Sequence, residues 1–322
     1  MSQRARVFID GEAGTTGLGI RDRLRALPQL DLRSLPSDSR KNPEARRALM
    51  REVDLVVLCL PDAAARESVA LADSLGEAAP KLLDASTAHR VAPGWTYGFP
   101  ELAPGQAGRI AAASRVANPG CYPTGAIALL RPLVDAGLLP ADHPLTINAI
   151  SGYSGGGKSM IAEHETGGGP AFELYALGLE HKHIPETQLY AGLTRRPIFS
   201  PAVGHYRQGM LVCVPLHLDT LPGAPTGADL HDALARRYAG APLVRVLPPG
   251  AEGTLEPEAL NDTDLLELRV FANEAHRQAV LVARLDNLGK GASGAAVQNI
   301  GLMLGLPGDI LRAATGRGPA HA

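Results

Sequence analysis

Short apolar runs alternate with stretches of helical periodicity through the first third of the chain. The runs that predict buried strands are residues 6–10, 31–35, 53–60 and 81–85. Residues 18–27 predict a helix, and its expected buried side chains are Leu18, Ile20, Leu24 and Leu27. Another helix is expected to begin near Pro61 or Asp62. Because strands joined by helices form parallel sheets covered on both faces, this region predicts a doubly wound sheet with its ligand at the strands' carboxyl ends.

The pattern changes after residue 118. Further runs that predict strands are residues 145–150, 209–218, 265–272 and 278–285. Their long connections favour a mixed sheet of the α+β type over more βαβ units. Residues 292–304 predict one helix that packs back on the first region. We therefore expect one domain from residues 1–118 plus 290–322 and a second from residues 119–289.

A glycine-rich loop follows the first predicted strand and opens the first helix. Its glycines have the spacing GxxGxxG rather than GxGxxG, which fits a reductase variant of the dinucleotide fingerprint. The residues expected to lie against a pyrophosphate are Gly11, Gly14, Thr15, Thr16 and Gly17. An ordinary glycine-rich turn is the alternative, but the βαβ pattern that follows favours a dinucleotide.

The segment after the second predicted strand distinguishes NADP from NAD. Basic and hydroxyl side chains there accommodate a ribose 2′-phosphate, whereas a lone carboxylate binds the 2′-hydroxyl. The residues expected to bind the 2′-phosphate are Ser37, Ser39, Arg40 and Lys41. Asp38 does not fit this pattern, and a solvated surface loop is the alternative. The balance of these side chains favours NADP(H).

Cys121 stands between a Pro-Gly turn and an apolar run, residues 126–130, that reads as the core of a helix. A thiol in the first turn of a helix lies among unpaired backbone N–H groups at the positive end of the helix dipole. That environment lowers the pKa of a thiol and makes it nucleophilic, and the same N–H groups can hold an oxyanion. A small buried residue is the alternative for a cysteine considered alone.

A thiolate and a dinucleotide together suggest chemistry on an acyl thioester, which needs a proton-transfer group beside the sulfur. His181 and His183 are the best candidates, and Glu186 is expected to orient an imidazole and keep it basic. Pro185 predicts an extended backbone at Ile184, so the two imidazoles would point to opposite sides and only one would face the thiol. A surface histidine pair is the alternative, and no third ligand supports a metal site.

Composition narrows the class of protein. The 322 residues carry a net charge of −2, which gives no basic field for nucleic acid or an anionic membrane. Three scattered cysteines form no disulfide framework and no zinc motif, and Cys59 and Cys213 lie inside apolar runs. We expect neither a secretory leader nor a membrane-spanning segment, because the sequence opens on a predicted strand and its apolar runs are short. We expect a cytoplasmic protein.

Five segments carry a resemblance to a known family. They are residues 8–17, 117–124, 151–155, 181–186 and 286–299. In this order they resemble the short form of N-acetyl-gamma-glutamyl-phosphate reductase, a relative of aspartate-semialdehyde dehydrogenase. The resemblance spans nearly the whole chain, and its thiol and terminal motifs are specific. The chain is shorter than the long form of the family, with reduced connections in the second domain.

The resemblance implies an α/β architecture, with an N-terminal Rossmann-type NADP-binding domain and an α+β catalytic and oligomerisation domain. It implies reduction of N-acetyl-glutamyl 5-phosphate by NADPH, with phosphate release, through a thioester on Cys121 in arginine biosynthesis. His183 would be the preferred acid–base residue, with His181 close behind. Further residues expected near the cofactor are Ser86, Asn287, Lys290 and Gly291, and those expected near the substrate are Arg90, Asn118, Ser151, Gly152 and Lys158.

Alternatives remain open at this stage. The same chemistry could act on aspartyl phosphate or on a carrier-linked aminoadipyl phosphate. A catalytically silent NADP-binding sensor is a third reading, and it predicts an inert Cys121. A homodimer or homotetramer is expected from exposed strands of the second domain.

Overall fold

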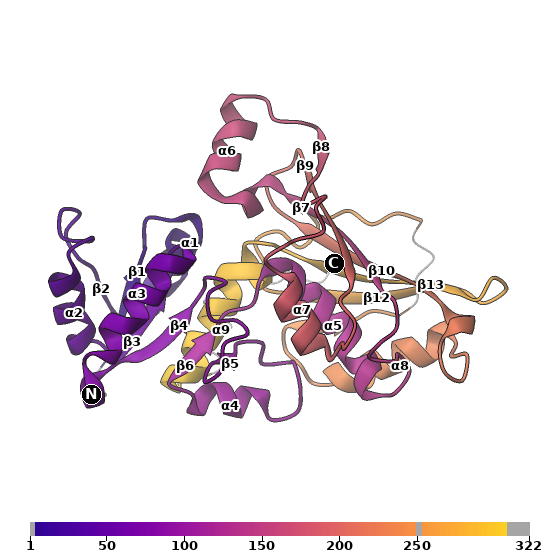
Figure 1. The fold of residues 1–322 in the computed structure, drawn as a ribbon, viewed down its shortest axis with the longest axis horizontal. Helices are drawn as coiled ribbons and strands as arrows, with labels where there is room; N and C mark the ends of the chain where they lie inside the picture. The colour runs from indigo at the N-terminus through magenta and orange to yellow at the C-terminus, as the bar shows by residue number, and fades with distance from the viewer. Residues whose placement is uncertain (1–3, 249–252, 308–322) are drawn as a thin grey trace. The chain divides into compact units, whose positions relative to one another are not determined.

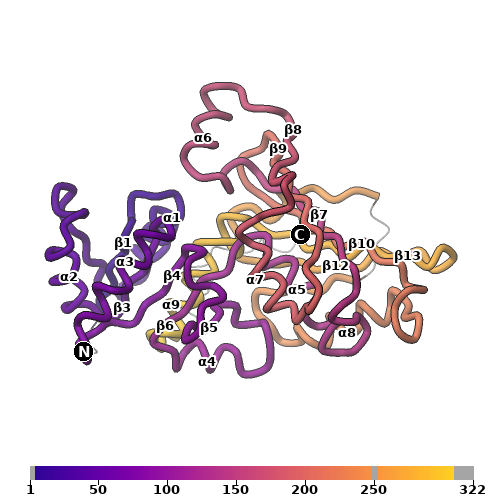
Figure 2. Tube along the Cα trace, in the orientation of Figure 1, coloured from indigo at the N-terminus to yellow at the C-terminus, as the bar shows by residue number. Residues whose placement is uncertain are grey.

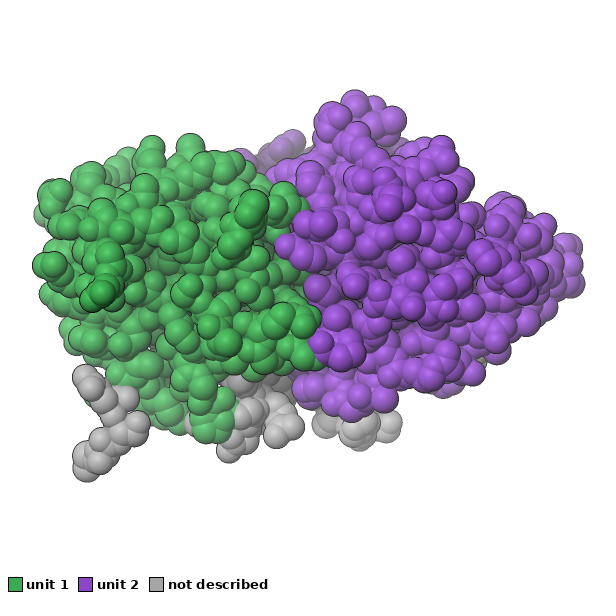
Figure 3. All heavy atoms as spheres, turned by 60° about the horizontal axis from the view of Figure 1, so that its bottom comes forward, with its two compact units in different colours: residues 1–100, 105–119, 292–322 green, residues 101–104, 120–291 purple. Residues whose placement is uncertain are grey.

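A computed structural model describes residues 4–248 and 253–307. The chain divides into two compact units (Figure 3). Unit 1 consists of residues 1–100, 105–119 and 292–322, and unit 2 of residues 101–104 and 120–291. Unit 1 is therefore completed by the last helix, after the chain has built unit 2. The functional assignment of each unit stays a prediction.

Unit 1 is a parallel sheet with helices (Figure 1). Its strands are β1 (Ala5–Asp10), β2 (Leu30–Arg33), β3 (Leu55–Leu58), β4 (Lys81–Asp84), β5 (Thr96–Tyr97) and β6 (Arg115–Ala117). Its α-helices are α1 (Thr15–Arg25), α2 (Pro43–Glu52), α3 (Asp62–Asp73), α4 (Gln106–Ala112) and α9 (Gly294–Leu304). The strand order is β2-β1-β3-β4-β6-β5. The chain adds β2 on one side of β1 and β3 on its other side, so the order of addition switches between β1 and β3. In a doubly wound sheet the ligand binds at that switch point.

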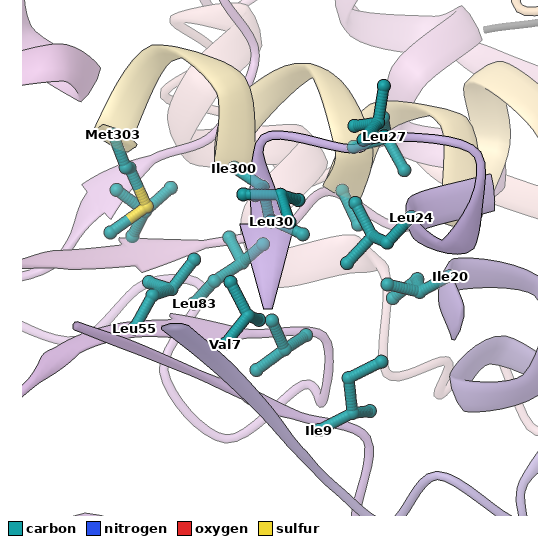
Figure 4. Close-up of a cluster of buried hydrophobic side chains, with 14 of the residues drawn as sticks. Val7, Ile9, Ile20, Leu24, Leu27, Leu30, Leu55, Leu83, Ile300 and Met303 are labelled. Carbon is teal, nitrogen blue, oxygen red and sulfur yellow. The ribbon is translucent and has the colours of Figure 1, made fainter. Parts of the chain in front are cut away.

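One core of unit 1 lies between the sheet and the helices α1 and α9 (Figure 4), and a second is formed with α2 and α3. Val7 and Ile9 from β1 meet Ile20 and Leu24 from α1, and all four are buried. The helix α9 adds further buried apolar side chains and contacts α1, α4 and β4. The expectation that the last predicted helix packs back on the first region is therefore confirmed.

The glycine loop is shorter than the sequence suggested. Helix α1 begins at Thr15 rather than Leu18, so Thr15 and Thr16 lie in its first turn. Leu18 was expected on the buried face but is 41% exposed. It stands two positions before Ile20, and a step of two residues turns a helix by roughly 200°, to the opposite side. The buried face of α1 is formed by Ile20 and Leu24 instead.

Unit 2 is a mixed sheet packed with α-helices. Its strands are β7 (Thr146–Gly152), β8 (Phe172–Leu174), β9 (Ile198–Gly204), β10 (Met210–His217), β11 (Val244–Val246), β12 (Leu266–Asn273) and β13 (Gln278–Leu285). Its α-helices are α5 (Cys121–Asp135), α6 (Gly157–Thr166), α7 (Ile184–Ala191) and α8 (Gly227–Tyr238). The order β11-β12-β13-β10-β7-β9-β8 contains parallel and antiparallel pairs. The predicted α/β class with a mixed second sheet is confirmed.

Helix α5 lies against β10, β12 and β13, with α7 and α8 beside it (Figure 1). Its residues from Tyr122 to Leu130 are all buried, which confirms the predicted helix core. Along β10 the burial alternates, as expected for a strand covered on one face by a helix. In contrast, α6 stands away from the sheet in the tube trace (Figure 2).

The predicted extended backbone at Ile184 is wrong. Helix α7 begins at Ile184, and Pro185 occupies its first turn. A proline there breaks no helical hydrogen bond, because first-turn N–H groups have no partner within the helix.

Within the described residues, no helix is long and apolar enough to cross a bilayer.

Candidate active site

Cys121 is the first residue of α5, as the sequence predicted. The backbone N–H of Gly120 donates to Glu186 Oε2 at 3.1 Å, and Glu186 is 1% exposed. Thr124 Oγ1 donates to the Gly120 carbonyl oxygen at 2.9 Å. The peptide that leads into the thiol is thus held from both sides, by α7 and by the first turn of α5. Glu186 was expected to orient an imidazole, and its position places it as a brace for the thiol's own backbone.

Both histidines lie against Tyr122, the residue after the thiol. The Tyr122 ring centroid is 6.1 Å from that of His181 and 5.9 Å from that of His183. The two imidazoles are 4.8 Å apart. The expectation that they point to opposite sides is therefore wrong. The turn that leads into α7 brings both rings to one side, where an extended segment would have separated them.

Hydrogen bonds distinguish the two imidazoles. The backbone N–H of His183 donates to His181 Nδ1 at 3.1 Å, which assigns the His181 proton to Nε2 in the neutral ring. Nε2 faces the hydroxyl of Tyr175 at 3.4 Å, and that hydroxyl donates to Tyr122 Oη at 3.3 Å. Tyr122 in turn donates to the carbonyl oxygen of Ala202 at 3.1 Å. His181 is thus the first member of a directed chain of donors.

Burial keeps the two tyrosines of this hydrogen-bond chain protonated. It raises the pKa of Tyr175 to about 12, with the nearby Cys121 charge contributing. It also raises the pKa of Tyr122. Both phenols therefore keep their protons at neutral pH and can donate.

The segment after β13 turns tightly beside the thiol. A Cβ atom built on Gly291 would lie 2.9 Å from Cys121 Cβ, closer than real Cβ contacts allow, so only glycine fits. Residues Gly289–Ser293 form a π-helical turn, a geometry that is frequent at functional sites. Lys290 is 1% exposed and its Nζ lies 2.9 Å from Glu101 Oε1. The Asn287 side chain bonds Ser154 Oγ and the Gly209 N–H, so it braces this turn.

The other two thiols differ from Cys121. Burial, together with the charges of Asp84 and Asp10, raises the pKa of Cys59 to about 12. Burial also raises the pKa of Cys213. Both thiols stay protonated and weakly nucleophilic at neutral pH, because the thiolate is the reactive form.

In unit 1 the glycine loop is held against β3. Gly11 has φ of +90°, and a Cβ there would collide with the Cys59 carbonyl group. Directly before it, Asp10 accepts from Arg46 Nη2 at 2.6 Å and from Ser68 Oγ at 2.7 Å. The loop therefore has a fixed starting point and a close backbone approach that only glycine permits.

A cavity of about 180 Å³ opens beside this loop, and its lining includes Gly11, Glu12, Leu35, Arg40 and Lys41. Two of the residues predicted to bind a 2′-phosphate are thus in its wall. Arginine and lysine donors around a cavity at the glycine loop fit a phosphate-bearing dinucleotide. Ser37 is exposed nearby, and Ser39 Oγ donates to Asp38 at 3.0 Å.

The remaining predicted site residues are divided between the two units. In unit 1, Arg90 is buried and its Nε donates to the carbonyl oxygen of Asn118 at 3.0 Å, so it is not a solvated charge. Ser86 donates to Asp84 at the end of β4. In unit 2, Ser151 and Gly152 end β7, and Lys158 is exposed in the first turn of α6. Their contact with substrate or cofactor stays a prediction.

Sequence reasoning missed two residues. Tyr175 belongs to no motif, and its link to His181 arises only because β8 brings it there. Glu12 was given no role within the glycine loop, yet it is buried and bonded to Ser34, which follows β2, and to Arg21 of α1. A carboxylate inside a glycine loop was the available signal.

Known proteins resemble this chain over almost all of its length. The family model described as "Semialdehyde dehydrogenase, dimerisation domain" matches residues 121–287. A relative named N-acetyl-gamma-glutamyl-phosphate reductase from Chelativorans sp. (strain BNC1) is 54% identical over 307 residues, which is 93% of this chain and 98% of that protein. N-acetyl-gamma-glutamyl-phosphate reductase 2 from Pseudomonas putida is 53% identical, over 93% of this chain and 96% of its own.

Solved structures show the same fold. Aspartate semialdehyde dehydrogenase II from Vibrio cholerae, complexed with ASA, matches with a TM-score of 0.67 and 16% identity, over 94% of this chain and 99% of its own. Aspartate semialdehyde dehydrogenase with NADP from Candida albicans matches with a TM-score of 0.63 and 15% identity, over 95% of this chain and 99% of its own. At this identity the match concerns the fold, whereas the sequence relatives identify the group. The chain belongs to the N-acetyl-gamma-glutamyl-phosphate reductase family of the semialdehyde dehydrogenases.

Proposed function

We propose that this protein reduces N-acetyl-L-glutamyl 5-phosphate to N-acetyl-L-glutamate 5-semialdehyde with NADPH and releases phosphate, as a step of arginine biosynthesis. The observation that carries the chemistry is Cys121 at the start of α5, with Glu186 bonded to the residue before it and two histidines against the residue after it. The names of the relatives support the substrate.

In the first step Cys121 Sγ attacks the acyl carbon, and the bond from that carbon to the phosphate oxygen breaks. The N–H of Tyr122 has no partner among the described residues outside the helix, and it supports the carbonyl oxygen as negative charge develops there. Pro123 contributes no N–H, and the N–H of Thr124 already donates to the Gly120 carbonyl oxygen. The first turn thus limits where the oxyanion can be held.

His183 is the proposed acid–base residue. Its competitor, His181, has Nδ1 occupied by a backbone N–H and its Nε2 proton directed to Tyr175. His181 would have to break these hydrogen bonds to accept a proton from sulfur. His183 takes the proton from Sγ, passes it to the leaving phosphate, and later returns a solvent proton to the sulfur.

The glycine loop and the cavity beside it would hold the cofactor, with Gly11 against the pyrophosphate and Arg40 and Lys41 at the 2′-phosphate. When bound there, NADPH would supply the hydride for reduction of the thioester carbon. Collapse of the resulting adduct breaks the C–S bond, releases the aldehyde and leaves Cys121 as a thiolate.

The decisive assay is phosphate-dependent reduction of NADP⁺ with different aldehydes. We expect N-acetyl-L-glutamate 5-semialdehyde to support it and aspartate semialdehyde not to. Activity with the aspartate compound alone would overturn the substrate, and activity with NAD⁺ alone would overturn the cofactor. NADPH binding with no aldehyde turnover and no iodoacetamide reaction at Cys121 would instead identify a sensor.

We also infer a homodimer or homotetramer. The edge strand β8 exposes Phe172 (55%) and Leu174 (51%), and both lie in the segment that matches a dimerisation domain. Apolar side chains on a sheet edge are typical of a surface that another chain covers. Sedimentation of a Phe172→Glu variant tests this. If the variant stays associated like the wild-type protein, β8 is not part of the interface between subunits. A cytoplasmic location agrees with a reaction that needs a reduced thiol.

A further inference from the structure

Glu12 is a buried carboxylate in an unusual place, directly after the first glycine of the loop. It is 5% exposed. A buried carboxylate is costly unless donors surround it. Three donors do so here, since Ser34 Oγ lies 2.9 Å from Oε2, Arg21 Nη1 lies 3.3 Å from Oε2, and Arg40 Nη2 lies 2.6 Å from Oε1.

These contacts join the two segments of the proposed cofactor site. Glu12 belongs to the glycine loop, whereas Ser34 and Arg40 follow β2 and stand on the side where a ribose substituent is read. Glu12, Arg40 and Lys41 all line the same cavity. The position of the Arg40 side chain therefore depends on a residue of the loop.

The way Arg40 is held leaves donors for a ligand. Its Nε donates to the Leu35 carbonyl oxygen at 3.3 Å and its Nη2 pairs with Glu12, while no described residue bonds Nη1. Arginine has five N–H groups in a planar fork, so a guanidinium fixed through Nε and Nη2 can present Nη1 to a phosphate. Glu12 Oε1 meets Arg40 as an ion pair and accepts no aligned hydrogen bond within the described residues.

The charges also suit a phosphate. Arg21 lies on the other side of Glu12, so one carboxylate faces two guanidinium groups, and Lys41 adds a further positive charge at the cavity. The carboxylate orients Arg40 without cancelling the positive charge around the cavity. A ribose 2′-phosphate carries close to two negative charges and fits such a surplus, whereas a 2′-hydroxyl gains little from it.

We propose that Glu12 is the positioning residue for NADP selectivity: it holds Arg40 at the cavity so that the guanidinium meets a 2′-phosphate without reordering. This inference rests on the proposed NADPH-dependent function. It assigns the glycine loop a second task, beyond its approach to the pyrophosphate.

The test measures dissociation constants for NADPH and NADH by nucleotide fluorescence in the full-length protein. The variants are Glu12→Gln, Arg40→Gln and the double variant. Glu12→Gln keeps the side-chain shape, and we expect it to weaken NADPH binding about tenfold. NADH binding should change by no more than roughly twofold, and kcat at saturating NADPH should persist. In the Arg40→Gln background the Glu12 change should have almost no further effect.

Asp31→Asn is the matched control, because it removes another arginine–carboxylate pair of β2, with Arg33 at 2.9 Å, away from the cavity lining. It should leave the NADPH-to-NADH ratio unchanged. Equal losses for both nucleotides in Glu12→Gln would overturn the inference, as would tighter NADPH binding or effects that simply add in the double variant. A wild-type protein that does not prefer NADPH would instead refute the proposed cofactor, whatever Glu12 does.

Discussion

The two candidate sites differ in how far apart their residues lie along the chain. The candidate cofactor cavity of unit 1 is lined by β1 and the loop after it, by the segment after β2 and by Leu60 after β3, all within the first 60 residues. The thiol site of unit 2 gathers residues 120–122, Tyr175, the start of α7 and Gly291. A site of the first kind can be read from local motifs, whereas one of the second kind depends on the fold of the whole unit. Substitutions in the two sites should therefore separate binding from chemistry.

Cys121→Ser should have the largest effect and should separate the sites most clearly. We expect turnover to fall at least about 10³-fold, because the nucleophile is lost, while NADPH affinity stays nearly the same. The aldehyde assay and nucleotide fluorescence measure the two quantities. Cys213→Ser is the control and should keep its turnover. Loss of NADPH binding in Cys121→Ser would show that the two sites are not separable.

Substitution of each histidine should show which of the two contributes more to kcat. His183→Gln should lower kcat by roughly 10²–10⁴-fold, the usual range for a lost acid–base group. His181→Gln should cost about tenfold, since it breaks a supporting hydrogen-bond chain. The pH profile of kcat/KM in each variant is the second readout, and only His183→Gln should lose the limb due to the acid–base group. The reverse ranking would contradict the tautomer inferred for His181.

Gly11→Ala tests the nucleotide site through its backbone. The added methyl would meet the Cys59 carbonyl group at a φ of +90°, so we expect a loss of about 1–3 kcal/mol in the free energy of unfolding. NADPH affinity should fall with it. Urea denaturation measures the first quantity. Gly76→Ala is the control, because Gly76 has φ of +57° but open space around it, and it should cost less.

The last prediction is a loss of stability that depends on Cys59 and is confined to alkaline pH. The pKa of this thiol is raised from 9.0 to about 12 in the folded protein. Its contribution to stability is therefore complete below pH 9 and declines as the pH rises from 9 towards 12, because only the unfolded chain ionises freely there. Cys59→Ala should flatten this decline in urea midpoints measured across that range. An unchanged slope would show that Cys59 ionises equally in both states.

Much of the fold followed from local pattern. Strands β1, β3, β4, β10, β12 and β13 are short apolar runs, and the start of α5 was evident from Gly120 followed by an apolar stretch. The turn into α7 was misjudged, because the restriction that Pro185 places on Ile184 competes with the tolerance of a first helical turn for proline. In the candidate site, Cys121 and the histidines were proposed from their motifs, and the structure places both histidines against Tyr122, the residue after Cys121. Tyr175 and Glu12 were not, since pairing across long sequence separations and burial decide their roles.

Asn118 has a consequence for the architecture of the chain. Its amide nitrogen donates to the carbonyl oxygen of Ala292 at 3.1 Å, so the points where the chain leaves unit 1 and returns to it lie next to each other. Apart from residues 101–104, unit 2 is in this sense an insertion between two neighbouring positions of unit 1. A bridge of only a few residues would span that gap. Unit 1 could then accept a different insert at the same junction, with the cavity beside the glycine loop left as it is.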